Sequence, residues 1–317
     1  MTTQTVYSLA ICGRAILDLH SLNNEGGESN QTMTRMVTIV HKSEGKPKLA
    51  TVNAISGDMF KHIQAEHLYR LAKGNLKLCA GCEKFSASRV LDDADFMKKL
   101  PDTSAEVIDA LLQHCALDDL EGNLIAKGNR SVPRKSVAEF GWVVGLPDVT
   151  RTESYFHVRY ATEHGKDLET QQQAIFHRPA SSGVYAIVAS FEIARIGYND
   201  ITQQYAVKED ERARRYKAFA ESILYTFVEP NGAMRGTQNP HILGFEGAVT
   251  VSTQVVPAPL LSALDDGYRE EVKRVASALN ALHPNAITVH EFASMGAFAE
   301  IMQKLIADST PFTMKVA

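Results

Sequence analysis

The sequence lacks the features that mark several large classes of protein. It has 4 cysteines among 317 residues, too few for the disulfide framework of a small secreted protein. No uninterrupted apolar run approaches the roughly 20 residues that a membrane-spanning helix needs. The first residues show neither the basic start nor the cleavage pattern of a secretory signal peptide. We therefore expect a cytoplasmic protein that has no membrane partner.

An excess of positive charge is also missing. The formal net charge is -4 at pH 7, and 22% of the residues are charged and 44% hydrophobic, as in an ordinary globular protein. The composition gives no overall signal for nucleic acid, so any site for a polyanion must be a local basic patch. A chain of 317 residues is long enough for one large core or two domains.

The motifs of the common catalytic centres are absent from the sequence. It contains no HExxH, no GxSxG, no Walker loop and no glycine-rich dinucleotide loop. Asp92, Asp93 and Asp95 lack the glycine and the final glutamate of a calcium-binding loop. Asp118 and Asp119 are expected at a solvated helix end. These absences favour a protein that is not an enzyme.

The most informative stretch is residues 51–73, which reads as a strand end, a sharp junction and a helix. Ser56 is a good N-cap, because its hydroxyl can accept from one of the first unpaired amides of the helix. Lys61 and His62 lie off the apolar stripe of this helix. A helix N-terminus with a serine hydroxyl and a lysine one turn in suits a phosphate. The other interpretation is an ordinary capped amphipathic helix.

Periodicity along the rest of the chain predicts a mixed α+β protein. Strand patterns occur at residues 6–17, 34–40, 49–55 and 183–196, and residues 21–31 read as a polar, glycine-rich loop. Helix patterns begin at the capping box Thr103/Glu106 and cover residues 208–228, 266–282 and 291–307. Arg212, Arg214, Arg215 and Lys217 are expected to form a basic face at the start of the helix at 208–228. Residues 151–179 read as a long hairpin, with a polar tip at 163–170.

The order of these elements predicts a split βαβ, ferredoxin-like core, in which two helices cover an antiparallel sheet. Residues 74–101 have no sustained period, and the stretch 74–150 as a whole interrupts that order, so we expect it to form an insertion that projects from the core.

Two cysteines in this insertion, Cys79 and Cys82, have the spacing of half a zinc site. The other half is not evident from the sequence, although His62, His67, His114 and Cys115 could meet the pair in the fold. A thioredoxin-like redox motif is disfavoured, because no helix starts at this pair in a βαβ context. Two cysteines without metal in a loop are the remaining alternative.

Basic side chains gather near loops and element ends. Lysine, arginine and helix N-termini bind phosphates, whereas aromatic or apolar side chains stack on bases. Each basic residue alone is typical of a solvated surface charge. The basic candidates are Arg14, Arg35, Lys61, Arg130, Arg134, Lys135, Arg151 and Arg235.

Several long runs give the chain a resemblance to a known family. The runs are SLAICGRAILDLHSLNNEG, NQTMTRMVTIV, VNAISGDMFKHIQAEHL, RKSVAEFGWVVGLP, SSGVYAIVASFEIARIGYNDIT and RRYKAFAESILYTFVEPNGAMRGTQNPHILGFEG. With these runs in this order, the chain resembles the backbone subunit of type I CRISPR surveillance complexes (Cascade), in the DevR-type autoregulator branch. The resemblance covers nearly the whole chain.

The resemblance implies a fold and partners. It implies a modified RNA-recognition-motif palm at residues 1–73 and 181–317, helical fingers at 74–150 and a β-hairpin thumb at 151–180. Such subunits stack on one another along one CRISPR RNA (crRNA), together with other Cascade subunits. They leave the bases of the guide free to pair with target DNA, so no catalytic residue is expected.

The resemblance also implies the RNA-binding residues. It places Ser56, Lys61 and His62 at the groove for the guide phosphates. Further candidates at matching loops are Arg14, Arg35, Arg130, Arg134, Lys135, Arg235 and Gln238. This role requires no cofactor, and a zinc ion at Cys79 and Cys82 would only stiffen the fingers.

Two other functions stay open at this point. An RNA-processing endonuclease would need a general base near the scissile 2'-hydroxyl, and His62 or His177 could supply it. A DNA-binding autoregulator of the CRISPR locus would need a DNA-reading element, and the sequence shows no helix-turn-helix pattern.

Overall fold

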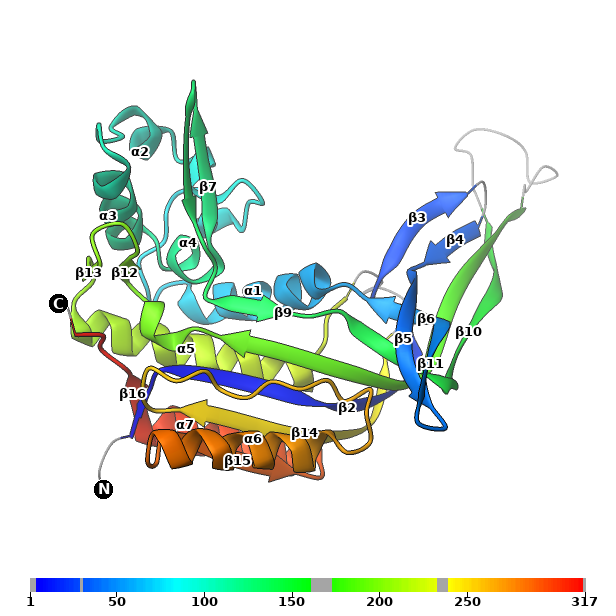
Figure 1. Ribbon diagram of the computed structural model, residues 1–317. Helices are drawn as coiled ribbons and strands as arrows, with labels where there is room; N and C mark the ends of the chain where they lie inside the picture. The colour runs from blue at the N-terminus through cyan, green and yellow to red at the C-terminus, as the bar shows by residue number, and fades with distance from the viewer. Residues whose placement is uncertain (1–3, 29–30, 161–172, 233–238, 316–317) are drawn as a thin grey trace, which may run out of the picture.

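A large antiparallel sheet organises the protein. The computed structural model describes residues 4–28, 31–160, 173–232 and 239–315. Neighbouring strands follow the order β15-β14-β2-β11-β10-β6-β5, and every pairing along this path is antiparallel (Figure 1). The strands are β2 (Ser8–His20), β5 (Met36–Ser43), β6 (Lys46–Ile55), β10 (Val143–Tyr160), β11 (Gln173–Phe191), β14 (His241–Ser252) and β15 (Ile287–Phe292). The mixed α+β class predicted from periodicity is confirmed.

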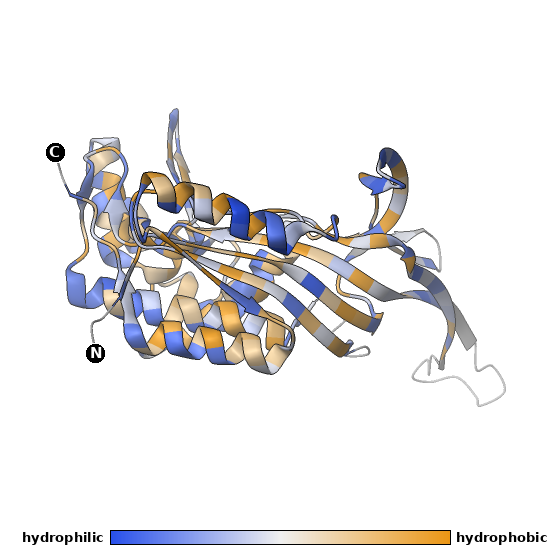
Figure 2. Cartoon of the chain, turned by 60° about the horizontal axis from the view of Figure 1, so that its bottom comes forward, coloured by the Kyte–Doolittle hydropathy of each residue, from blue (hydrophilic) through white to orange (hydrophobic). Residues whose placement is uncertain are grey.

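Helices cover both faces of this sheet. On one face α1 (Gly57–Ala72), α5 (Glu209–Val228) and α7 (Met295–Asp308) pack on a core that includes Leu9 and Ile11 of β2. On the other face α6 (Tyr268–Leu282) packs on a second core that includes Cys12. Figure 2 shows apolar residues interspersed with polar ones along the strands. Four consecutive residues of β2, from Leu9 to Cys12, are buried, and because successive side chains point to opposite faces, both faces of the sheet are covered there. Within the described residues, none of the helices has the length and apolarity needed to cross a membrane.

Residues 74–137, called the insert below, project from the face of the sheet that carries α1 (Figure 1). Its elements are η1 (Cys82–Lys84), η2 (Arg89–Asp92), α2 (Ala94–Lys98), α3 (Ser104–His114), α4 (Ala116–Glu121), β7 (Asn123–Lys127) and β8 (Arg130–Arg134). The predicted capping box is confirmed, because the Thr103 hydroxyl accepts from the Glu106 amide at 3.2 Å while the Glu106 carboxylate accepts from the Thr103 amide at 3.2 Å. After the insert, β9 (Ala138–Phe140) pairs with β11 and returns the chain to the sheet.

Strands β10 and β11 continue beyond the sheet as one long hairpin. Their cross-strand pairs run on to Tyr160 and Gln173, which confirms the predicted hairpin arms. The predicted tip, residues 163–170, lies outside the described residues. The register shifts between Gly145 and Thr150, at the point where the hairpin leaves the sheet. Short pairs complete the fold: β1 (Gln4–Val6) with β16 (Ser309–Pro311), and β12 (Tyr198–Asn199) with β13 (Gln204–Tyr205).

Two sequence predictions of secondary structure are wrong. The predicted loop at residues 21–31 contains β3 (Asn24–Glu28), which pairs with β4 (Gln31–Thr34), because a backbone ladder needs no apolar side chains. The predicted helix at 291–307 starts too early. Residues up to Phe292 belong to β15, and α7 begins only after Ser294, whose hydroxyl accepts from the Ala297 amide at 3.2 Å.

Candidate nucleic-acid interface and metal site

The junction between β6 and α1 is held by side chains from three parts of the chain. The Ser56 hydroxyl accepts from the Met59 amide at 3.1 Å, as expected for an N-cap. The Ser56 amide donates to the side-chain oxygen of Asn23 at 2.9 Å. A Cβ on Gly57 would lie 2.1 Å from the carbonyl oxygen of Phe140, so only glycine lets the end of β9 approach this closely. The start of α1 is therefore fixed in place.

One turn further along, Lys61 and His62 line a cleft of about 340 Å³ between α1 and the insert. Phe85 and Arg89 form the opposite wall, and Glu121 lies at the base. Burial lowers the pKa of Lys61 and raises the pKa of Glu121. His62 is exposed, with its ring centroid 5.7 Å from that of Phe85. The cleft thus offers cations, an imidazole and an aromatic ring to a ligand.

Arg35 and Lys135 lie close to this region. The guanidinium of Arg35 lies 5.6 Å from the ring centre of Trp142, the single tryptophan of the chain, which is 44% exposed. Arg35 also accepts the Ala54 amide through its carbonyl, next to the start of α1. Lys135 is exposed and pairs with Glu139 at 2.8 Å and with Glu192 at 3.3 Å.

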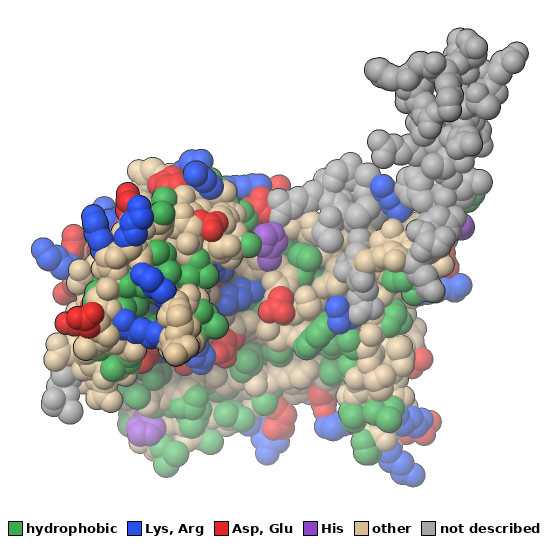
Figure 3. All heavy atoms as spheres, turned by 90° about the horizontal axis from the view of Figure 1, so that it is seen from above, with side chains coloured by type: hydrophobic (Ala, Val, Ile, Leu, Met, Phe, Trp, Pro, Cys, Tyr) green, Lys and Arg blue, Asp and Glu red, His purple; other side chains and the backbone are tan. Residues whose placement is uncertain are grey.

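The structure places the other predicted basic residues elsewhere. Arg14 faces α6 on the opposite side of the sheet, where it pairs with Asp266 at 2.7 Å. Arg130 belongs to β8 and donates to the Pro101 carbonyl at 2.6 Å. Arg151 is on the hairpin, with 82% of its side chain exposed. Arg235 and Gln238 lie outside the described residues. Seen from above, basic and acidic side chains are intermixed over the insert (Figure 3).

Arg134 lies inside the protein, in an ion network with Asp119 and Arg215. Its side chain is 1% exposed and contacts Asp119 at 2.7 Å, and Arg215 contacts the other oxygen of Asp119 at 2.9 Å. The prediction of a solvated helix end is wrong, since Asp118 and Asp119 are both fully buried. The predicted basic face on α5 is wrong at Arg212 and Arg215, which are buried as well. Alternation patterns cannot find such residues, because ion pairing and not hydrophobicity accounts for their burial.

The insert also brings together Cys79, Cys82, Cys115 and Asp118. One ligand atom from each lies within 4.8 Å of all the others, and all four residues are buried. This donor set could hold a zinc ion, and it supplies the half that the sequence left open. The histidines have other partners: His114 bonds to Asp93 at 2.8 Å and His67 to the Glu229 carbonyl at 2.9 Å. Burial raises the pKa of Asp118 to about 7 and also raises the pKa of Cys115.

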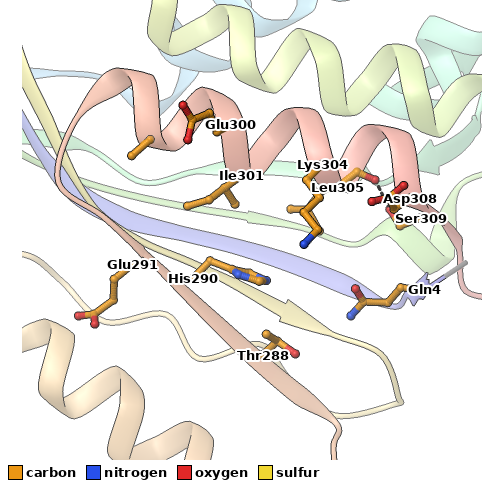
Figure 4. Close-up of a pocket in the computed structure, with 11 residues that line it drawn as sticks. Gln4, Thr288, His290, Glu291, Glu300, Ile301, Lys304, Leu305, Asp308 and Ser309 are labelled. Atoms are coloured by element: carbon orange, nitrogen blue, oxygen red, sulfur yellow. Dashed lines mark hydrogen bonds between the residues drawn. The ribbon is translucent and has the colours of Figure 1, made fainter. Parts of the chain in front are cut away.

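A further cavity of about 510 Å³ lies between α7 and β15, lined by His290, Glu300 and Lys304 (Figure 4). Burial and the charge of Lys304 lower the pKa of His290. This cavity is formed by elements other than α1 and the insert.

Sequence reasoning missed Phe85, Arg89 and Trp142. Phe85 and Arg89 fall in the part of the insert that has no period, and nothing in the pattern singles them out. Trp142 had a usable signal, because a single tryptophan stands inside the run RKSVAEFGWVVGLP.

The family model and the curated relatives that match this chain carry the same family names, Csa2 and DevR. The family model described as "CRISPR-associated negative auto-regulator DevR/Csa2" matches residues 11–273, well over half of the chain. The chain is 24% identical to "CRISPR-associated protein Cas7/Csa2 1" of Saccharolobus solfataricus, over 68% of this chain and 70% of that protein. It is 23% identical to "CRISPR-associated protein Cas7/Cst2/DevR" of Methanocaldococcus jannaschii, over 94% of this chain and 98% of that protein.

Solved structures titled "CRISPR RNA-guided surveillance complex, pre-nicking" and "CRISPR RNA-guided surveillance complex" contain similar chains. The first has a TM-score of 0.49 at 14% identity, covering 95% of this chain and 99% of the other. The second has a TM-score of 0.45 at 13% identity, covering 95% and 98%.

Proposed function

This chain belongs to the family described as CRISPR-associated negative auto-regulator DevR/Csa2, and on that ground we propose that it is the backbone subunit of a type I CRISPR surveillance complex (Cascade). In this role it is not an enzyme. Several copies, with other Cascade subunits, line up along one crRNA and present it for pairing with target DNA. The family match over residues 11–273 is the observation that carries the proposal.

The sheet supports a palm of the RNA-recognition-motif type. Along the chain β2, α1, β10, β11, α5 and β14 follow the β-α-β-β-α-β order of a split βαβ fold. Their four strands are neighbours in the sheet, in the order β14-β2-β11-β10. We propose residues 1–73 and 181–317 as the palm, 74–150 as the fingers and 151–180 as the thumb. The last residues of the proposed fingers, from Ala138 on, pair within the sheet.

We propose that the guide backbone runs past the start of α1 and the cleft. Because burial penalises the charged form of Lys61, a phosphate at the mouth of the cleft would restore that charge at a favourable position. His62 and Phe85 offer rings for stacking, and Arg35, Ser56 and Lys135 surround the junction. Arg151 would add a cation from the thumb. Arg134 would act from inside the protein, where it donates to the carbonyls of Arg195 and Tyr198 and so fixes the insert to the segment after β11. Arg14, Arg130, Arg235 and Gln238 complete the proposed set.

Backbone contacts suit this function. Base pairing reads the sequence of the guide in RNA-guided complexes, so the protein recognises shape and phosphates. Repetition along one RNA multiplies contacts that are individually weak. A chain with a net charge of -4 can therefore bind RNA through a local groove.

The first test is to express the protein with and without its CRISPR locus and to sequence the nucleic acid that copurifies. We expect RNA of uniform guide length, protected from nuclease at regular intervals. A monomer free of RNA under both conditions would overturn the proposal. Cleavage of repeat RNA by the isolated protein would favour an endonuclease, and tight binding to one DNA operator without a guide would favour a repressor.

The second test is Lys61→Ala in the full chain. Affinity for guide RNA should fall to a similar degree for all guide sequences, and the slope of log K against log salt should decrease by about 1. Arg274→Ala is the matched control, because Arg274 is an exposed cation on α6, on the other face of the sheet. A loss of affinity confined to one guide sequence would contradict the proposal that Lys61 contacts the guide phosphates.

A further inference from the structure

Two neighbouring carboxylates in α4 have very different surroundings. Asp118 and Asp119 are both fully buried. Asp119 pairs with Arg134 and Arg215 and accepts the Gly197 amide. Among the described residues, neither lysine nor arginine bonds to Asp118. Asp118 accepts from the side-chain amide of Asn123 and from the thiols of Cys79 at 3.3 Å and Cys82 at 3.5 Å.

A buried carboxylate without a cation is costly, because removing the charge from water is not repaid. The same fold supplies two cations to Asp119 and, among the described residues, none to Asp118. Asp118 therefore either holds a proton or faces a cation that is not a side chain. The third thiol, Cys115, completes the set, and the four ligand atoms lie within 4.8 Å of one another.

We propose that Cys79, Cys82, Cys115 and Asp118 bind one zinc ion in a closed, four-coordinate structural site. Thiolates are soft ligands that favour zinc over magnesium or calcium, and a carboxylate is an accepted fourth ligand. On binding, the thiols that are still protonated release their protons to solvent and become thiolates. A thiol-only packing cluster does not explain the presence of Asp118.

The site has a structural consequence beyond the insert. Its ligands come from the turn at Cys79–Cys82 and from the junction of α3 and α4, so the ion would tie these two segments together. Cys82 also lines the cleft beside Lys61, and Phe85, three residues further on, is stacked on Tyr69 of α1 with ring centroids 4.9 Å apart. The ion would thus fix the wall of the cleft opposite Lys61. The link between this wall and RNA rests on the proposed function, whereas zinc binding itself does not.

The test begins with the metal content of the purified full-length protein, measured by mass spectrometry. We expect about one zinc per chain, as in a structural site. Cys115→Ser and Asp118→Ala should each lose most of this zinc. Cys12→Ser is the matched control and should keep it, because Cys12 is a buried thiol in β2 whose contact is the Ala248 carbonyl. Equal zinc in the ligand variants and in the control would overturn the site.

A second measurement avoids variants that fail to fold. Reduced wild-type protein, stripped of metal, is titrated with Co²⁺, which reports tetrahedral thiolate ligation through charge-transfer and d–d absorption bands. We expect saturation at about one cobalt per chain, with displacement by zinc. No zinc in the native protein together with no cobalt bands would overturn the proposal.

Guide-RNA binding then separates the two proposals. We expect Cys115→Ser to lower RNA affinity and Cys12→Ser to leave it unchanged. Zinc without any RNA binding in the wild type would refute the RNA-binding function and leave the metal site intact. RNA binding by a protein that holds no zinc would refute the metal site and leave the RNA-binding function intact.

Discussion

The sheet and the insert are held together by different kinds of contact. Beneath the sheet, Phe227 and Phe245 stack at 4.9 Å, and Phe298 meets both rings edge-on at 5.4 and 5.0 Å. Between the insert and α5, the central contact is Asp119 with its two buried arginines. Apolar packing tolerates small rearrangements, whereas an ion network is favourable only in one geometry. The difference suggests that the sheet supplies bulk stability and the junction fixes the orientation of the insert.

Replacing Asp119 by alanine should be the most damaging change at this junction. It would remove the buried counter-ion that Arg134 and Arg215 share, leaving them the half-exposed Asp200 at 3.2 Å and Glu211 at 3.0 Å. Breaking a buried pair costs about 3–5 kcal/mol. Urea unfolding followed by circular dichroism measures this loss. Asp200→Ala is the control and should cost about 1 kcal/mol or less, because the Asp200 side chain is 45% exposed. If Asp119→Ala lost no more unfolding free energy than the control, the buried ion network would not be what holds the insert to α5.

The next prediction concerns the sheet, in which His20 is a buried titratable side chain that the fold keeps neutral. Burial lowers the pKa of His20 from 6.5 to about 4. Between these values the unfolded chain binds a proton that the folded chain does not, so stability falls as pH drops from 6.5 to 4. The full effect is roughly 3 kcal/mol, and at pH 7 it is absent.

The measurement compares unfolding free energies at pH 7 and pH 4 for the wild type and His20→Gln. The variant should lose less stability between the two pH values. His283→Gln, at an exposed position, should behave as the wild type. An identical pH dependence of the unfolding free energy for all three proteins would mean that folding does not lower the pKa of His20.

The smallest expected effect concerns helix caps, one in each region. Ser56→Ala and Thr103→Ala should each cost about 1 kcal/mol, because each hydroxyl accepts a hydrogen bond from a helix amide. Ser88→Ala is the control, since Ser88 precedes η2 without a side-chain cap bond. Thermal unfolding gives the three values. A far larger loss for Ser56→Ala would show that the junction before α1 depends on more than a cap.

Regular patterns made much of the fold predictable. Helices α1, α3, α5 and α6 and the β10–β11 hairpin follow from periodicity and capping residues, which act over a few neighbouring positions. The glycine-rich strand β3 was not predicted, because its backbone pairing with β4 does not depend on apolar side chains. The start of α7 was predicted too early, because Phe292 fits the pattern of a strand and that of a helix equally well.

The candidate site was predictable only in part, for a related reason. Ser56, Lys61 and His62 follow each other along one helix, so local spacing places them. Cys82 and Asp118 are 36 residues apart, and their meeting depends on how α3 and α4 pack. The same holds for Asp119 and Arg215, 96 residues apart. No local pattern encodes such distances.

The register shift where the hairpin leaves the sheet has a mechanical consequence. Beyond it, the paired arms run from Thr150 to Tyr160, a lever of about 34 Å at about 3.4 Å per residue. At the joint a Cβ on Gly183 would lie 2.5 Å from the Val149 carbonyl oxygen, so the two strands approach this closely only because residue 183 has no side chain. A rotation of about 5° there moves the far end by about 3 Å. The absence of one side chain thus sets the angle, and with it the reach, of the whole arm.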